Sequence, residues 1–145
     1  MRDVLSCEQY TRESLEKVMV LAEKVKNNPK AFSRVLDGKI IAVMFFEPST
    51  STRMSFESAI QRLGAKMIVT ENALANSSTT KGESLEDTIR VIAGYSDAIV
   101  MRHRINDAAE RAAKVSNVPI INAGSGSRRT SNSSFIRYVY NKRKK

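Results

Sequence analysis

The strongest constraint on the fold is a repeated alternation of short apolar runs with longer amphipathic segments. The run at 39–46 is continuous and rich in Ile, Val and Phe, as expected of a strand covered on both faces. Parallel neighbouring strands need a crossover connection, usually a helix. The sequence therefore predicts an α/β fold, an open parallel sheet of about four strands with helices on both faces. The expected strands are 39–46, 66–70, 98–101 and 118–122, and the expected helices are 12–26, 52–63, 85–95 and 107–115.

Capping residues mark the ends of these helices. Thr11 is placed to cap the first helix, and Pro29 lies just beyond its end. Gly64 follows the second helix, where a left-handed C-terminal residue is common. Ser84 and Asp87 have capping-box spacing before the third helix. The polar connection 72–81 is longer than the others in the body of the chain, so we expect it to be mobile or functional.

The formal net charge of +9 raises the question of nucleic-acid binding, but the charge is unevenly distributed. Seven of the 24 basic residues lie at 128–145, where no acidic residue occurs. The other 17 basic residues face 15 acidic ones, so the body of the chain carries only +2. We therefore expect no specific nucleic-acid partner, and only weak, salt-sensitive contact of 128–145 with polyanions.

The remaining composition excludes several other classes of protein. The first eleven residues contain no long apolar run, so we expect neither a secretory signal nor a membrane span, and a cytoplasmic location. Cys7 is the single cysteine, which excludes an intrachain disulfide, and with one His we expect no metal site. No Gly-rich Walker pattern occurs, so a P-loop nucleotide site is not supported.

Small hydroxyl residues follow the first strand and lead into a helix, at 49–52. Right-handed crossovers bring the carboxyl ends of parallel strands to one edge, where ligands of open α/β sheets bind. Backbone N–H groups at a helix start attract anions, and nearby hydroxyls add hydrogen bonds to phosphate oxygens. From spacing alone, two readings stay open: a phosphate site, or hydroxyl residues that only cap the helix.

Four further stretches of the sequence form an ordered set of motifs. They are Phe45-Phe46-Glu47-Pro48-Ser49-Thr50-Ser51-Thr52-Arg53-Met54-Ser55-Phe56-Glu57, Lys81-Gly82-Glu83-Ser84-Leu85 with Asp87-Thr88, Ile99-Val100-Met101-Arg102-His103, and Val118-Pro119-Ile120-Ile121-Asn122-Ala123-Gly124. In this order they resemble the aspartate/ornithine carbamoyltransferase family, and the resemblance covers about 13–127. The Arg-His pair with the Asn-Ala-Gly ending favours the aspartate branch over an ornithine carbamoyltransferase-like chain.

The resemblance implies an activity without a cofactor: transfer of the carbamoyl group of carbamoyl phosphate to L-aspartate in pyrimidine biosynthesis. Attack of the amine creates an oxyanion and releases phosphate, so catalysis rests on positioning and positive charge. Arg102 is the implied catalytic residue, and His103 is expected to be structural rather than a general base. The residues implied to bind carbamoyl phosphate are Ser49, Thr50, Ser51, Thr52 and Arg102.

The resemblance also implies assembly. Ser77 and Lys81 match the pair that the family inserts into a neighbouring subunit's site, which implies a homotrimer, and a regulatory subunit is a further partner that the family allows. From residue type alone, Arg102 and Lys81 can equally be solvated surface charges.

Two departures from the family pattern bear on activity. Ser51 stands where the family carries an arginine, so a bidentate cation is replaced by a neutral hydroxyl. After Ser127 the family continues with a His-Pro-Thr-Gln segment, but this chain reads differently. One permitted set of codons for 130–137, ACA TCC AAC TCA AGC TTT ATT AGA, gives His-Pro-Thr-Gln-Ala-Leu-Leu when read one nucleotide later. We therefore predict a frameshift near Arg129.

The expected organisation follows from this. Residues 1–127 form an incomplete carbamoyl-phosphate-binding domain, 128–145 form a basic tail outside the family pattern that is expected to be disordered, and the aspartate-binding domain is absent. The chain is thus expected to be inactive alone. A non-catalytic module that binds phosphate-type anions or assembles with other subunits is the alternative, and a nucleic-acid-binding protein is the third class.

Overall fold

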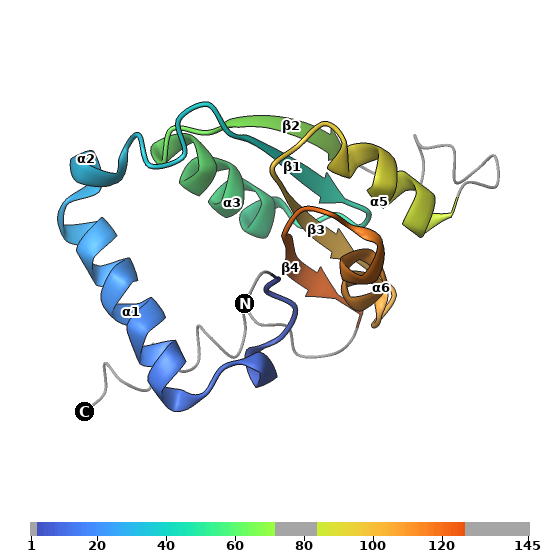
Figure 1. Ribbon diagram of the computed structural model, residues 1–145, viewed down its shortest axis with the longest axis horizontal. Coiled ribbons are helices and arrows are strands. Elements are labelled where there is room, and N and C mark those ends of the chain that lie inside the picture. The colour runs from blue at the N-terminus through green and yellow to red at the C-terminus, as the bar shows by residue number, and fades with distance from the viewer. Residues whose placement is uncertain (1–2, 72–83, 127–145) are drawn as a thin grey trace.

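A four-stranded parallel sheet forms the centre of the protein (Figure 1), in a computed structural model that describes residues 3–71 and 84–126. The strand order is β2-β1-β3-β4, so β1 and β3 are central. The strands are β1 (Ile40–Phe45), β2 (Lys66–Glu71), β3 (Ala98–His103) and β4 (Ile120–Ser125), and the helices are η1 (Cys7–Gln9), α1 (Arg12–Asn27), α2 (Pro29–Phe32), α3 (Thr50–Arg62), α5 (Leu85–Ala93) and α6 (Ala108–Val115).

The expected fold class is confirmed, with helices on both faces of the sheet. Because side chains alternate along a strand, Ala42 and Met44 of β1 pack with α5 and α6, whereas Ile41 and Val43 pack on the other face with α3. Val43 is fully buried, which accounts for the unbroken apolar run from which this strand was predicted.

The helix caps also agree with the sequence. The Thr11 hydroxyl accepts a hydrogen bond from Ser14 N at 3.2 Å, and the Ser84 hydroxyl accepts one from Asp87 N at 3.1 Å. Gly64 adopts a φ of +89° just after α3, and a Cβ there would lie 2.5 Å from the Ser33 carbonyl oxygen. Glycine is therefore required both by the backbone conformation and by the close packing of this turn.

Residues at the start of the chain pair with the outer edge of β4. Val4 N donates to Ile120 O and Asn122 N donates to Val4 O, each at 2.8 Å, and the Asp3 carboxylate accepts from Ile120 N at 2.9 Å. These bonds cover an otherwise open sheet edge. The composition gave no signal for this pairing.

The helix α1 stands away from the sheet (Figure 1), and none of its residues is buried in the described structure. Pro29 ends it as expected, but the four-residue helix α2 that begins at this proline was not foreseen. Within the described ranges no helix is long and apolar enough to cross a membrane. The long connection 72–81 and the tail 128–145 lie outside the described residues, so the domain boundary predicted at 127 stays a prediction.

Candidate anion site

The carboxyl ends of β1, β3 and β4 meet at one edge of the sheet, as parallel strands require (Figure 1). Phe45 of β1 lies beside Arg102 of β3, and Phe46 N donates to the Arg102 carbonyl oxygen at 2.8 Å. The turn from β1 into α3 therefore starts next to Arg102. This edge is where we expected the ligand site.

The first turn of α3 carries the hydroxyl residues. The helix begins at Thr50, two residues earlier than predicted, so Thr50, Ser51 and Thr52 all lie within its first turn. Ser49 is the N-cap residue, with φ −159°, and its side chain makes no capping hydrogen bond in the described part of the chain. Helix geometry leaves the first N–H groups without intrahelical carbonyl partners. This helix start therefore presents backbone donors and hydroxyls at the strand edge.

Arg102 contributes positive charge at the same edge. Its Nη2 pairs with Glu47 Oε1 at 2.5 Å, and its Nη1 donates to the Ala123 carbonyl oxygen at 3.5 Å, the limit for a hydrogen bond. Its Nε is buried and has no partner among the described residues. The side chain is 24% exposed, so this guanidinium still has donors to offer a ligand.

An irregularity in the pairing of β3 with β4 makes room for this side chain. The register shifts after Met101, so that Arg102 lies opposite Gly124 and Ala123 is the extra residue. Gly124 has a φ of +143°, and a Cβ at this position would clash with Arg102 Nη1. The glycine of the Asn-Ala-Gly motif thus allows the guanidinium to lie against β4.

A second ion pair lies one turn into α3. Arg53 Nε pairs with Glu57 Oε1 at 3.2 Å, and both side chains are only about a quarter exposed, 25% and 21%. Glu47, Arg53 and Glu57 were not predicted as site residues, although all three lie inside the first motif. Their signal was the placement of charged residues beside the hydroxyl run.

His103 is packed into the core beside the sheet edge, and its expected structural role stays a prediction. It is 5% exposed, its ring packs on Phe46 with centroids 4.9 Å apart, and its Nδ1 accepts a hydrogen bond from Ile105 N at 3.0 Å. Burial lowers the pKa of His103, and the positive charge of Arg104 adds to this. The imidazole is therefore neutral at pH 7, with Nδ1 unprotonated.

Asn122 fixes the end of β4 from within the core. Its Nδ2 donates to Leu5 O at 2.9 Å and to Ser125 Oγ at 3.1 Å, and its Oδ1 accepts from Gly124 N at 2.9 Å. The side chain is 5% exposed. These bonds set the backbone on which the Arg102 side chain lies.

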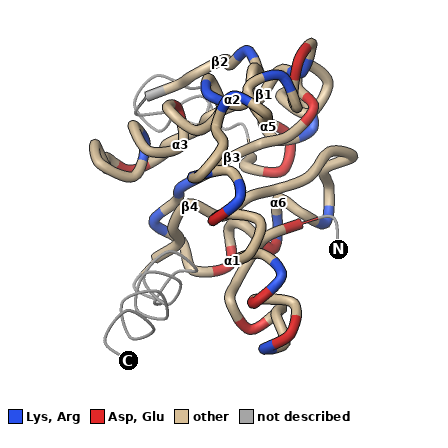
Figure 2. The backbone as a smooth tube through the Cα atoms, turned by 90° about the vertical axis from the view of Figure 1, so that its left-hand side faces the viewer, with Lys and Arg blue, Asp and Glu red and all other residues tan. Residues whose placement is uncertain are grey.

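The predicted site residues fall into two groups. The structure brings five of them to one edge: Ser49, Thr50, Ser51, Thr52 and Arg102. Ser77 and Lys81 lie outside the described residues. Basic and acidic residues are interspersed along the described elements (Figure 2), in keeping with the nearly balanced charge of the chain body.

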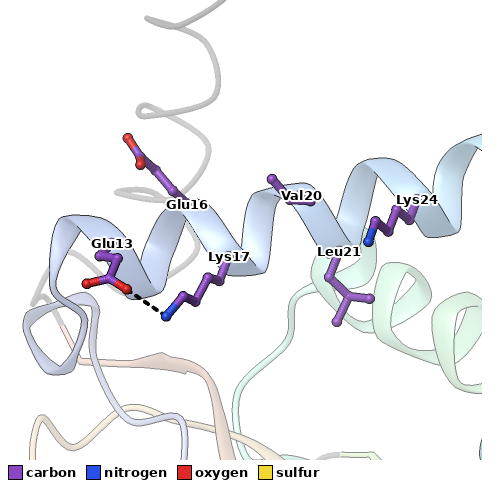
Figure 3. A pocket seen from close by; sticks show the side chains of 6 residues that line it. All are labelled: Glu13, Glu16, Lys17, Val20, Leu21 and Lys24. Carbon is purple, nitrogen blue, oxygen red and sulfur yellow. Dashed lines mark ion pairs between the residues drawn. The ribbon is translucent and has the colours of Figure 1, made fainter.

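A groove beside α1 is a separate feature (Figure 3). All its lining residues come from α1, and Glu13 and Lys17 form an ion pair at 2.7 Å across it. Val20 and Leu21 are 52% and 54% exposed. Because α1 is not the helix that follows β1, this groove is not the strand-edge site.

The fold and the site together define a class, an open parallel α/β domain with a candidate anion site where its first strand leads into a helix. The chain belongs to the family described as the carbamoyl-P binding domain of aspartate/ornithine carbamoyltransferases, which matches residues 2–130. It is 50% identical over 125 residues to an aspartate carbamoyltransferase catalytic subunit from Clostridium novyi, covering 86% of this chain and 40% of that protein.

Solved structures of aspartate transcarbamoylases also match this chain. The catalytic subunit of aspartate transcarbamoylase from M. jannaschii matches with a TM-score of 0.86 at 43% identity, over 94% of this chain and 45% of that one. The Trypanosoma cruzi enzyme, in a complex with carbamoyl phosphate and aspartate, matches with a TM-score of 0.86 at 35% identity, over 95% and 46%. The chain thus spans less than half the length of these relatives.

Proposed function

We propose that this chain binds carbamoyl phosphate, with the first turn of α3 and Arg102 holding the phosphate. The observation that carries the proposal is the Arg102 guanidinium, held at the strand edge with a buried Nε that has no partner in the described structure. A buried donor of a charged group is costly to leave unpaired, so a ligand oxygen there restores a charge-assisted hydrogen bond. The hydroxyls and amides at the start of α3 would bind the remaining phosphate oxygens.

The parent reaction that we propose is transfer of the carbamoyl group to L-aspartate. Phosphate binding would position the carbamoyl carbon, and Arg102 would stabilise the negative charge that develops as the amine attacks. We favour aspartate over ornithine as the acceptor because the relatives reported above are named aspartate carbamoyltransferase and aspartate transcarbamoylase. We further propose that these 145 residues are inactive by themselves, because they match only 40% of the Clostridium novyi protein and 45% of the M. jannaschii one.

Ser51 is the residue on which ligand affinity is proposed to depend. It is exposed in the first turn of α3 and adds a hydroxyl but no charge. Loss of one electrostatic contact to developing charge costs about 10²–10³ in turnover. A non-catalytic module that binds phosphate-type anions or assembles with other subunits is the second candidate, and this neutral side chain is the observation that favours it.

Assembly also belongs to the proposal. We propose a homotrimer in which Ser77 and Lys81 serve a neighbouring site, and a regulatory subunit as a further partner. The expected cytoplasmic location stays a prediction from the sequence.

Calorimetric titration with carbamoyl phosphate tests the proposal. The unaltered chain should bind weakly and Arg102→Gln should not bind. Ser51→Arg should bind about 10–100-fold more tightly, because a charge-assisted hydrogen bond contributes about 1.5–3 kcal/mol. Ser58→Arg is the matched control: it adds the same charge to an exposed position of α3, about 10 Å along the helix, and should change affinity little.

Three results would contradict parts of this account. Tight binding by the unaltered chain would favour the non-catalytic module over a weakened enzyme domain. Equal gains from the two serine-to-arginine changes would show a general charge effect and not a site at the first turn. Undiminished binding by Arg102→Gln would exclude Arg102 from the site.

A further inference from the structure

We propose that Asn122 is a positioning residue for Arg102, through which the pairing of residues 3–5 with β4 controls the ligand affinity of the anion site. This inference rests on the proposed function, because it concerns how the guanidinium of that site is held. The edge segment, residues 3–5, then supports the anion site in addition to covering the outer edge of β4.

The edge segment pairs with β4 just before the irregular part of that strand (Figure 1). Val4 forms a parallel bridge with Ile121. Val4 N donates to Ile120 O, and Val4 O accepts from Asn122 N, each at 2.8 Å. Asn122 lies opposite Met101, and the register of β3 with β4 shifts at the next residue of β3. The edge segment is therefore bonded to the last regularly paired residue of β4 before the shift.

The Asn122 side chain continues this connection toward the end of β4. Its Nδ2 donates to Leu5 O and its Oδ1 accepts from Gly124 N, each at 2.9 Å. A carboxamide can donate and accept at the same time, which a carboxylate cannot do. The side chain is 5% exposed, and hydrogen bonds are stronger in such a poorly hydrated environment. One side chain thus links the edge segment to the backbone of residue 124.

Arg102 contacts β4 at the two residues that this link encloses. Its Nη1 donates to Ala123 O at 3.5 Å, and its guanidinium lies against Gly124, where a Cβ would clash with it. Ala123 is the extra residue in the pairing of β3 with β4, and such a residue is left out of the regular ladder. The bond from Gly124 N to the Asn122 side chain spans Ala123 and so fixes the backbone on which the guanidinium lies.

Calorimetric titration of the complete 145-residue chain with carbamoyl phosphate provides the test. Val4→Pro removes the N–H that bonds to Ile120 O. It should weaken binding about tenfold, because a loosened edge segment no longer holds Asn122 in place. Asn122→Ala should weaken binding at least as much.

Thr11→Ala is the matched control. It removes the hydroxyl that accepts from Ser14 N at the start of α1, just beyond the edge segment, and it leaves the bonds of residues 3–5 intact. Loss of a helix cap also lowers stability, so stability alone would predict similar effects of Thr11→Ala and Val4→Pro. We expect Thr11→Ala to change Kd less than about twofold.

NMR of the ligand-free chain separates positioning from a purely structural role. The Arg102 side-chain Nε–H resonance should shift in Val4→Pro and in Asn122→Ala but not in Thr11→Ala. The Asn122 side-chain amide resonances should also shift in Val4→Pro. Thermal unfolding checks that each variant is folded, and Val4→Pro provides every readout if Asn122→Ala does not fold. An unchanged Nε–H resonance in Val4→Pro would overturn the inference, as would weaker binding without a shift of the Asn122 amide.

The remaining outcomes separate this inference from the proposed function. If the unaltered chain binds carbamoyl phosphate and Val4→Pro binds it equally tightly, the inference is wrong and the proposed site stands. If the unaltered chain does not bind, both are wrong.

Discussion

The variant Gly124→Ala should have two effects: a loss of stability from backbone strain, and a displacement of the Arg102 side chain that weakens ligand binding. Residue 124 has a φ of +143°, which residues with a side chain rarely adopt, and strain of this kind costs about 1–3 kcal/mol. At about 4 °C per kcal/mol for a domain of this size, Tm should fall by about 4–12 °C. The new methyl group would also meet Nη1 of Arg102. We therefore expect the guanidinium to move and carbamoyl phosphate binding to weaken by about 10–100-fold, equivalent to one charge-assisted hydrogen bond.

Gly38→Ala is the control for backbone strain. Gly38 also has a positive φ, +77°, but nothing lies within 4 Å of a Cβ built there. This variant should lose about 1–2 kcal/mol of stability and bind as the unaltered chain does. Differential scanning calorimetry gives the two values of Tm, and titration of the folded proteins gives the two affinities. If Gly124→Ala binds as tightly as Gly38→Ala, close approach to residue 124 does not position Arg102.

Three further predictions concern other parts of the chain. Burial lowers the pKa of His103, so the contribution of its neutral form to stability is complete above about pH 6.5 and declines as pH falls below that value. The variant His103→Asn keeps a hydrogen-bond acceptor but does not titrate, so the free energy of urea unfolding should depend less on pH in this range. An unchanged pH profile would contradict this prediction. Asn122→Ala should lose about 2–4 kcal/mol in the same assay at neutral pH, because its hydrogen bonds with Leu5 O, Ser125 Oγ and Gly124 N are removed. A loss below about 1 kcal/mol would show that water replaces the amide. Sequencing the gene should show codons at 130–137 that give His-Pro-Thr-Gln in the next frame, and any other codon set would refute the frameshift.

The sequence was informative where local pattern controls structure. Val43 belongs to an unbroken apolar run, and its complete burial follows from a strand covered on both faces. Thr11 and Ser84 cap helices where their side chains predicted it. Arg102 lies at the same sheet edge as the hydroxyl run, and this could be predicted because parallel strands end at one edge.

The interactions that the sequence did not reveal join distant residues. Glu47 and Arg102 are separated by 55 positions, and their ion pair depends on the β1–β3 register. The pairing of Val4 with the edge of β4 joins residues still farther apart in the sequence, and no apolar run around Val4 predicts a strand there. Local periodicity carries no information about such contacts, because they are set by which strands become neighbours. The irregular pairing that places Gly124 opposite Arg102 is hidden for the same reason.

The central claim is that a phosphate-type ligand binds where β1 leads into α3. An amide NMR titration of the uniformly 15N-labelled chain with carbamoyl phosphate tests this most directly. We expect saturable shifts of the Thr50, Ser51 and Thr52 amides and of the Arg102 side-chain Nε–H, with one shared Kd. Shifts confined to the groove beside α1, or absence of any saturable shift at these groups, would contradict it.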